Sequence, residues 1–463
     1  MRPMRFSVCP LVGDPNHWRI HGEVAPDALL EGIGEGTKDL GGAPALGRGR
    51  RDGPGRRLRR HLRGATQGLG EDGSIIVFVH GFQFDPRFPQ LKRAARHKLH
   101  DVNRHAGVLG FRQKGGAPGD AAEIDGHATP WLARMTPDGI SRDFPGLAVT
   151  FAYESCGGAL VVDGQVTDRD VFDMFADFNW RDGRLSNAYS RAYQEAGRAG
   201  RALADVIEAL AEDLARSDPQ GGDGRGRKID IVCHSLGSRV ALKAVEVLAD
   251  RYRPAGEGAN IALNRVGRVV MMAGAALWPQ AASALEAVIA AEPDWRPELY
   301  NVGSVHDDVL RILGSRMALS VSAAEAGLAF YPLENLIRFI TGAETIGIEG
   351  APKPWMYGGD EEPYADWIDL PLSSAGVRDW GRRQGFELKG DHDPDVIGDH
   401  WVHCTWPGNW ALYRAILRDA ARARWSVNRL RRDLAVKIPP ARLRQLRWEA
   451  RERDASAWQG AGV

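Results

Sequence analysis

One serine in the chain stands where a buried strand should turn into a helix. The stretch "KIDIVCHSLGSRVALKAVEVLAD", residues 228–250, leads from apolar, β-prone residues into Ser235 and then into apolar residues at helical spacing. At such a sharp turn the serine hydroxyl is pushed out at the carboxyl edge of the sheet, and the residues two positions to either side must be small. Cys233 and Gly237 fill those positions. We therefore predict that Ser235 is a nucleophile and that the Leu236 N–H, at the helix start, binds a developing oxyanion.

A second motif, "FVHGF", ends the continuous apolar run of residues 74–82. In acyl-transfer enzymes with a nucleophile exposed in this way, the other oxyanion donor is a backbone N–H just after His-Gly. That rule indicates Phe82, with Gln83 next in line, and Gly81 allows the backbone to approach a substrate. We expect His80 to hold this loop by hydrogen bonding rather than to act as the base. The plain alternative is that the two residues only end a strand.

Two adjacent aspartates are candidates for the acidic partner. Asp307 and Asp308 follow the predicted strand "ELYNVGS", and the chain order Ser, Asp, His accompanies a strand-to-helix nucleophile. A carboxylate at this place can accept a hydrogen bond from the base and stabilise its charged form. We favour Asp307 because it is nearer the strand end, whereas Asp308 can cap the helix that follows. Both could also be ordinary cap or turn residues.

Three histidines are candidates for the base, all within "KGDHDPDVIGDHWVHCTWPGNW". His392, His400 and His403 each follow the last predicted strand and precede the final helix, where a catalytic imidazole is expected. We predict His400, because a loop gives it freedom to reach the nucleophile and Trp401 can brace its ring. His403 lies closer to the helix and is less free. His392 and His403 remain the alternatives.

Strands alternating with helices must position these residues. Such alternation implies parallel strands joined by right-handed crossovers, and therefore an α/β sheet covered on both faces. We predict a mostly parallel central sheet with helices on both faces, whose last strand is either "WIDLPL" or "GFELKG". The buried strands are expected at 74–82, 146–155, 229–233, 266–274 and 298–304, and one long helix at 185–217.

The remaining segments divide the chain by composition. Residues 1–73 are predicted to be an N-terminal segment with possible first strands and a Gly/Arg-rich linker, and residues 74–424 the main domain. Insertions are expected near residues 107–146 and 314–365. Residues 425–463 are predicted to be a basic, helical C-terminal tail.

In this order, "VFVHGF", "IVCHSLGSRV", "YNVGSVHDDVL" and "GDHW" resemble the α/β-hydrolase superfamily, in particular its bacterial esterase- and lipase-like family with FVHGF and HSMG-type motifs. The resemblance implies an α/β-hydrolase fold and a serine hydrolase that cleaves carboxylic esters through a Ser–His–Asp triad, without a cofactor. Two features depart from the pattern. Cys233 replaces the usual glycine, and the long interval between His80 and Ser235 indicates an insertion near the site.

Other functions remain open at this stage. An acyltransferase would use the same triad and the same acyl-enzyme, and a binding protein could retain the fold without activity. The acidic and histidine-rich residues of 391–404 include types that bind divalent metals, but they coincide with the place where the base belongs. We therefore predict no metal site.

Composition and charge restrict the class of protein. The chain has 463 residues, 43% of them hydrophobic, and a formal net charge of +0, so we expect a sizeable core and no nucleic-acid partner. The first residues lack a secretory apolar region, no window approaches the ~18 apolar residues of a membrane span, and the four cysteines are far apart. These features predict a cytoplasmic protein with reduced thiols. Its expected partner is a small-molecule or lipid-like ester.

Overall fold

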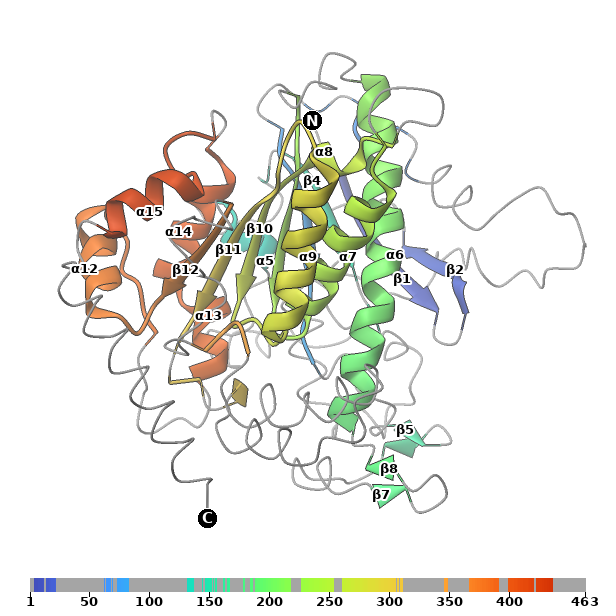
Figure 1. The fold of residues 1–463 in the computed structure, drawn as a ribbon, viewed down its shortest axis with the longest axis horizontal. Coiled ribbons are helices and arrows are strands. Elements are labelled where there is room, and N and C mark those ends of the chain that lie inside the picture. The colour runs from blue at the N-terminus through green and yellow to red at the C-terminus, as the bar shows by residue number, and fades with distance from the viewer. Residues whose placement is uncertain are drawn as a thin grey trace, which may run out of the picture.

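Eight strands form the main sheet of the computed structural model (Figure 1). Every neighbouring pair in this sheet is parallel except β1 and β2, which are antiparallel. The predicted α/β class and mostly parallel sheet are therefore confirmed, and of the two candidate last strands the one in "WIDLPL" enters the sheet. From one edge to the other the strands are β12 (Trp367–Pro371), β11 (Glu298–Gly303), β10 (Val266–Met272), β9 (Ile229–His234), β3 (Ile75–Val79), β4 (Leu147–Phe151), β1 (Met4–Leu11) and β2 (Asp14–His21).

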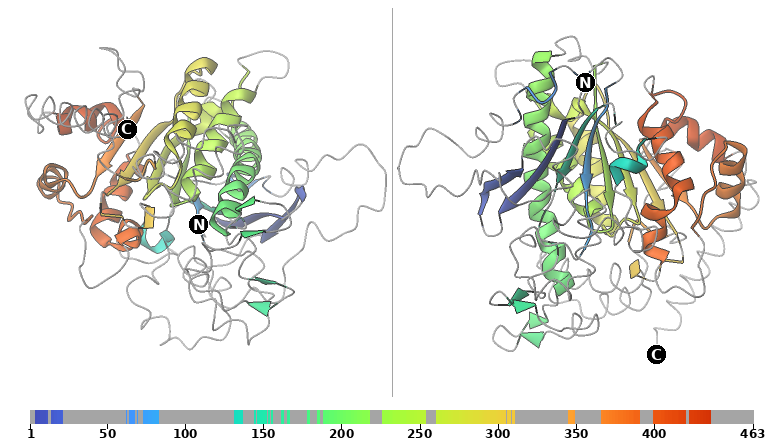
Figure 2. Two further views of the ribbon diagram at one scale, coloured as in Figure 1. Left: turned by 60° about the horizontal axis from the view of Figure 1, so that its bottom comes forward. Right: turned by 180° about the vertical axis from the view of Figure 1, so that it is seen from behind.

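Helices cover both faces of this sheet (Figure 2). The long helix predicted at residues 185–217 is α6, the longest element in Figure 1. Helices on the first face are α6 (Ala188–Ser217), α7 (Gly237–Arg251), α8 (Ala262–Arg265) and α9 (Trp278–Ala291). Helices on the second face are α5 (Trp131–Arg134), α12 (Ala375–Arg383), the 3-10 turn η8 (Asp399–Trp401), α13 (Val402–Thr405), α14 (Pro407–Leu417) and α15 (Val427–Ala435). Two small antiparallel sheets pair β5 (Val161–Val162) with β6 (Gln165–Val166) and β7 (Phe178–Asn179) with β8 (Arg184–Leu185).

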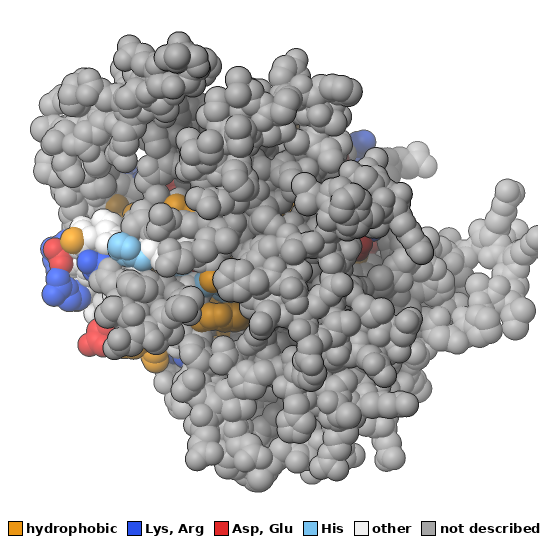
Figure 3. All heavy atoms as spheres, turned by 90° about the horizontal axis from the view of Figure 1, so that it is seen from below, with side chains coloured by type: hydrophobic (Ala, Val, Ile, Leu, Met, Phe, Trp, Pro, Cys, Tyr) orange, Lys and Arg blue, Asp and Glu red, His pale blue; other side chains and the backbone are white. Residues whose placement is uncertain are grey.

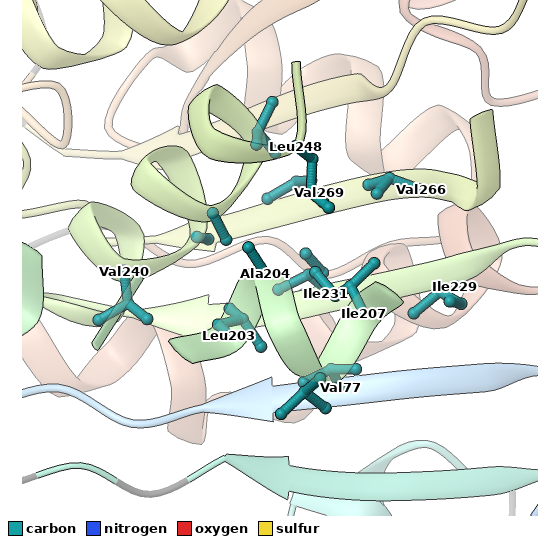
Figure 4. Packing of buried hydrophobic residues seen from close by; sticks show 14 of the residues in the cluster. Val77, Leu203, Ala204, Ile207, Ile229, Ile231, Val240, Leu248, Val266 and Val269 are labelled. Atoms are coloured by element: carbon teal, nitrogen blue, oxygen red, sulfur yellow. The ribbon is translucent and has the colours of Figure 1, made fainter. Parts of the chain in front are cut away.

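The alternation of side chains along each strand divides the core into two layers. Val77 and Ile231 point toward the first face, where Leu203 of α6 packs on them (Figure 4). Their chain neighbours Phe78 and Val232 belong to the cluster on the second face. Full burial of one such side chain stabilises the folded state by roughly 1.5–3 kcal/mol. Because these strands are covered on both faces, apolar residues occupy every position along them, and this explains the continuous apolar runs in the sequence.

The order of the strands reverses at the centre of the sheet. After β3 the chain crosses to β4 on one side, and after β4 it returns across β3 to β9, from which β10 and β11 follow on the other side. Ligands of open α/β sheets bind outside the carboxyl ends of the strands at such a switch point. The two predicted motifs, after β3 and after β9, therefore meet at the place where the topology favours a site.

A network of buried charges closes the opposite, amino edge. Arg268 of β10 contacts Glu298 of β11 at 2.8 Å, and Arg422 contacts Asp230 of β9 at 3.0 Å. The other Glu298 oxygen accepts a hydrogen bond from the Val427 N–H at 2.9 Å. This network joins the segment around α15 to three strands, and removing one partner of a buried ion pair costs about 3–5 kcal/mol.

Several predicted features lie outside the described residues, namely most of the N-terminal linker, most of both insertions, the end of the C-terminal tail, Gln83, Asp308 and His392. Within the described part, none of the helices is both long and apolar enough to span a membrane. The structure describes residues 4–11, 14–21, 62, 64–67, 69, 73–82, 131–136, 144, 146–151, 153, 155, 161–162, 165–166, 178–179, 184–185, 188–217, 226–253, 260–304, 306–307, 309–310, 345–348, 366–390, 399–419 and 422–435.

Candidate active site

Ser235 lies at the turn between β9 and α7 in a constrained backbone conformation. Its φ is +52°, in the left-handed region that residues other than glycine rarely occupy. The Ser235 N–H donates to the Met272 carbonyl at 2.9 Å, and the Ser235 carbonyl accepts from the N–H groups of Ser238 and Ala275 at 3.0 Å each. These bonds hold the elbow against the end of β10, so the surrounding structure maintains a conformation that is costly in isolation.

Two glycines allow the His-Gly loop to pack directly against this elbow. A Cβ atom placed on Gly81 would stand 2.8 Å from the Cβ of Ser235, and one placed on Gly237 would stand 2.7 Å from the carbonyl oxygens of Val79 and His80. Atoms do not approach this closely without displacement of the backbone. Both positions therefore require glycine, and the backbone after β3 lies against the predicted nucleophile.

His80 holds this loop, as expected from the sequence. Its Nε2 accepts a hydrogen bond from the Tyr153 N–H at 3.0 Å, which leaves Nδ1 to donate to the Gly81 carbonyl at 2.8 Å. The ring also stacks on Tyr153, with the ring centroids 4.5 Å apart, and Ser155 Oγ donates to the same Gly81 carbonyl at 2.7 Å. Because both nitrogens are engaged, His80 cannot serve as the base.

Asp307 and His400 form a buried hydrogen-bonded pair. His400 Nδ1 lies 2.8 Å from Asp307 Oδ2, the carboxylate is fully buried and the histidine is 4% exposed. A carboxylate that accepts from Nδ1–H holds the ring in the tautomer whose Nε2 can take up a proton. The second oxygen, Oδ1, accepts from the Leu310 N–H at 2.9 Å. Asp307 thus combines two roles that the sequence left as alternatives, the partner of a base and the cap of a turn.

The residue before the elbow serine connects it to this pair. His234 Nε2 lies 3.2 Å from the carbonyl oxygen of His400, and the centroids of the two rings are 4.5 Å apart. Trp401, the predicted brace, lies with its ring centroid 5.1 Å from that of His234 and 6.0 Å from that of His400. The histidine segment therefore folds back over the carboxyl edge of the sheet and rests on the elbow.

His403, an alternative base, is buried close to this pair. It is fully buried, and among the described residues neither ring nitrogen has a hydrogen-bond partner. Burial lowers its pKa to about 4, an effect that the nearby charge of Asp307 opposes. His403 is therefore a neutral imidazole at physiological pH.

This burial predicts an acid-dependent loss of stability. The pKa of His403 is about 4 in the folded chain against 6.5 for the ordinary side chain, so between these values only the unfolded chain takes up the proton. The contribution of neutral His403 to the free energy of unfolding is then fully present above pH ~6.5, and it decreases by about 3 kcal/mol as the pH falls to ~4. Denaturant titrations at a series of pH values should show a smaller decline for His403→Leu. An equal pH dependence in both proteins would contradict the assignment.

Cys233, the residue that replaces the usual glycine of the elbow, points away from the site. Its side chain is fully buried in the first-face cluster, with Sγ 3.5 Å from the Val270 carbonyl oxygen and 3.9 Å from Ser238 Oγ. Burial raises the pKa of this thiol to about 12, so the reactive thiolate is not formed at neutral pH. The geometry gives Cys233 a packing role.

Substitution of Cys233 should accordingly affect stability and not turnover. We expect Cys233→Gly to keep kcat within about threefold of the parent and to lose about 2 kcal/mol of unfolding free energy, because a buried group is removed and glycine weakens a strand. Cys233→Ala, which leaves the smaller cavity, should lose less. Steady-state kinetics with chemical unfolding of all three proteins tests this. An inactive but folded Cys233→Gly would show that the thiol takes part in the chemistry.

Backbone donors and apolar side chains surround the elbow. Leu236 precedes α7, and within the described part of the chain no group accepts a hydrogen bond from its N–H. Phe82, the other predicted donor, packs with Leu236 and Tyr193 in a third apolar cluster. On the face at the carboxyl ends of the strands, histidine atoms lie beside hydrophobic side chains where described residues reach the surface (Figure 3).

The structure thus gathers most of the predicted site residues in one place. Ser235, Leu236 and Phe82 lie together at the elbow, and the pair of Asp307 and His400 contacts this elbow through His234. Among the described residues no hydrogen bond joins Ser235 Oγ to a ring nitrogen of His400, and Asp308 and His392 lie outside the described residues. In the described part, no group of three His, Cys, Asp or Glu side chains is arranged to hold a metal ion.

Sequence reasoning gave no role to His234, although it is part of the elbow motif. Strand alternation could have found it, because residues 233 and 234 must face opposite sides of the sheet. Since Cys233 faces the helices of the first face, His234 has to face the segment that carries His400.

The geometry carries the functional argument alone, because comparisons with known proteins found no family model, curated protein or solved structure that matches this chain.

Proposed function

We propose that the chain is a serine hydrolase with an α/β-hydrolase fold, which cleaves carboxylic esters through Ser235, His400 and Asp307. The observation that carries this proposal is the buried 2.8 Å hydrogen bond between Asp307 and His400, on a segment that rests on the elbow of Ser235. An isolated cap or turn would not require an imidazole on the buried carboxylate. A base held by a third group next to a strained serine is the arrangement that activates a weak nucleophile.

In the first half of the reaction, His400 Nε2 takes the hydroxyl proton of Ser235 while Oγ attacks the ester carbonyl. Asp307 stabilises the resulting imidazolium without itself becoming protonated. The N–H groups of Leu236 and Phe82 stabilise the oxyanion, a contribution worth about 10²–10³-fold in rate for a single donor. The tetrahedral intermediate collapses, the alcohol leaves with the proton from His400, and an acyl-enzyme remains on Ser235.

In the second half, water replaces the alcohol. His400 takes a proton from the water, whose oxygen attacks the acyl carbonyl, and the second tetrahedral intermediate expels Ser235 with the proton returned from His400. The products are a carboxylic acid and the free enzyme. Transfer of the acyl group to an alcohol would differ only in the identity of this second nucleophile.

The proposal is tested by labelling with a fluorophosphonate probe and by turnover of p-nitrophenyl esters of increasing chain length. We expect covalent modification, located by peptide mapping at Ser235, and release of p-nitrophenol with short or medium acyl chains. An added alcohol that diverts the acyl group into a new ester would identify an acyltransferase. A folded protein that is neither labelled nor active would indicate a binding protein and overturn the proposal.

A further inference from the structure

In the segment that carries His400, five consecutive backbone carbonyls each accept a hydrogen bond from a side chain. Because α13 is so short, these carbonyls cannot all be satisfied within a helix. The 3.0 Å bond from the Tyr413 hydroxyl to the His403 carbonyl is typical of the run. The donors, in order from the carbonyl of residue 400 to that of 404, are His234 Nε2, Thr405 Oγ1, Asn409 Nδ2, Tyr413 Oη and Trp410 Nε1.

The first of these five donors differs from the others in its origin. Thr405, Asn409, Trp410 and Tyr413 belong to the same stretch of chain that they brace. His234 comes from the end of β9 and is separated from His400 by 166 positions. Its hydrogen bond reaches the carbonyl of the proposed base itself, so it ties the base to the residue next to the nucleophile.

The ring of His234 adds packing to this bond. It is fully buried and packs against the rings of both His400 and Trp401, with Trp131 of α5 at 6.4 Å in an edge contact. A backbone carbonyl can only accept a hydrogen bond, so Nε2 of His234 must carry the proton. The N–H donor of His234 therefore has an identified acceptor, and its flat ring has identified packing partners.

We propose that His234 is a positioning residue, which sets the distance and angle between the imidazole of His400 and the hydroxyl of Ser235. This inference rests on the function proposed above. Ser235 and His234 are adjacent on one rigid elbow, so a bond from His234 to the base transmits the position of the nucleophile directly to the base. A misplacement of about 1 Å in such a pair can lower the rate about 10²-fold. In this role His234 acts through His400 and exchanges no proton with the substrate.

Two substitutions separate the hydrogen bond from the packing. His234→Phe keeps a flat ring against Trp401 and removes the donor, whereas His234→Gln can place an N–H where Nε2 stands and removes the ring. We expect His234→Phe to lower kcat about 10–100-fold with KM changed less than about twofold. His234→Gln should recover most of that loss. The second-order rate of fluorophosphonate labelling should follow kcat in both variants.

The matched control is Glu298→Gln, which weakens the buried network at the opposite edge of the sheet. It should lower the thermal midpoint as much as the His234 variants or more, without changing kcat per labelled site. Labelling run to completion counts the competent molecules, so reduced folding is not mistaken for reduced turnover.

Three results would overturn the inference. The first is an unchanged kcat in His234→Phe. The second is a loss of kcat in His234→Phe that is equally large in His234→Gln. The third is an equal loss of kcat per labelled site in His234→Phe and Glu298→Gln. Failure of the proposed function is a separate result, because the parent protein itself would then resist the probe. A parent that is labelled at Ser235 while the His234 variants react at the same rate retains the hydrolase proposal and removes only the role of His234.

Discussion

Replacement of Ser235 by alanine is expected to lower kcat for p-nitrophenyl esters by about 10⁴-fold or more, because no other group can form the acyl-enzyme. The fold should persist. The turn is held by backbone hydrogen bonds to Met272, Ser238 and Ala275, none of which uses the hydroxyl. Kinetics together with the thermal midpoint of the purified variant measures both quantities.

Ser238→Ala provides the matched control for this experiment. Ser238 is a fully buried serine one turn further along the chain, so its substitution removes a hydroxyl from the same helix start without touching the nucleophile. It should retain most of the activity and also label with the fluorophosphonate probe. Comparable turnover by Ser235→Ala and the parent would eliminate the serine hydrolase.

Replacement of His400 by alanine should reduce kcat as severely as the change at Ser235. In the proposed reaction the imidazole takes the proton in one step and returns it in the next, and members of a catalytic unit do not contribute additively. The double variant Ser235→Ala/His400→Ala should therefore be about as slow as either single variant. Activity is measured with the same ester, and circular dichroism shows whether the buried pair with Asp307 is needed for folding.

The other histidines of this segment test the assignment of the base. His403→Ala should keep most activity, since His403 is a buried neutral ring whose nitrogens meet no partner among the described residues. We expect the same of His392→Ala. If instead one of these two variants is inactive and His400→Ala turns over normally, the base is a different histidine while the reaction class stands.

The central strands and the elbow could be predicted because their signals are local. The run "IIVFV" is apolar at every position, which indicates a strand covered on both faces. The glycine two residues after Ser235 indicates a turn with no space for a side chain. The choice between "WIDLPL" and "GFELKG" could not be made, because both segments are apolar enough and only the pairing of β12 with β11 decides between them.

The site was predictable in its residue types and less so in its contacts. The position of Asp307 directly after a predicted strand favoured it as the acidic partner, and the loop that carries His400 favoured that histidine as the base. The hydrogen bond between them, however, joins residues 93 positions apart. The bond from His234 to the His400 carbonyl, and the run of braced carbonyls, depend on how a short helix packs on a distant strand. No periodicity in the sequence encodes such a contact.

The buried charges at the amino edge also have a consequence for the order of folding during synthesis. The second face of the sheet is covered largely by residues 366–435, including Trp425 and Leu430. Until this segment leaves the ribosome, the apolar second face stays uncovered and Asp230 lacks Arg422. A nascent chain that stops near residue 365 would thus carry both an exposed apolar sheet and unpaired charges, and such species aggregate or bind chaperones. The last helices complete the sheet, and we expect the folded state to form only after they emerge.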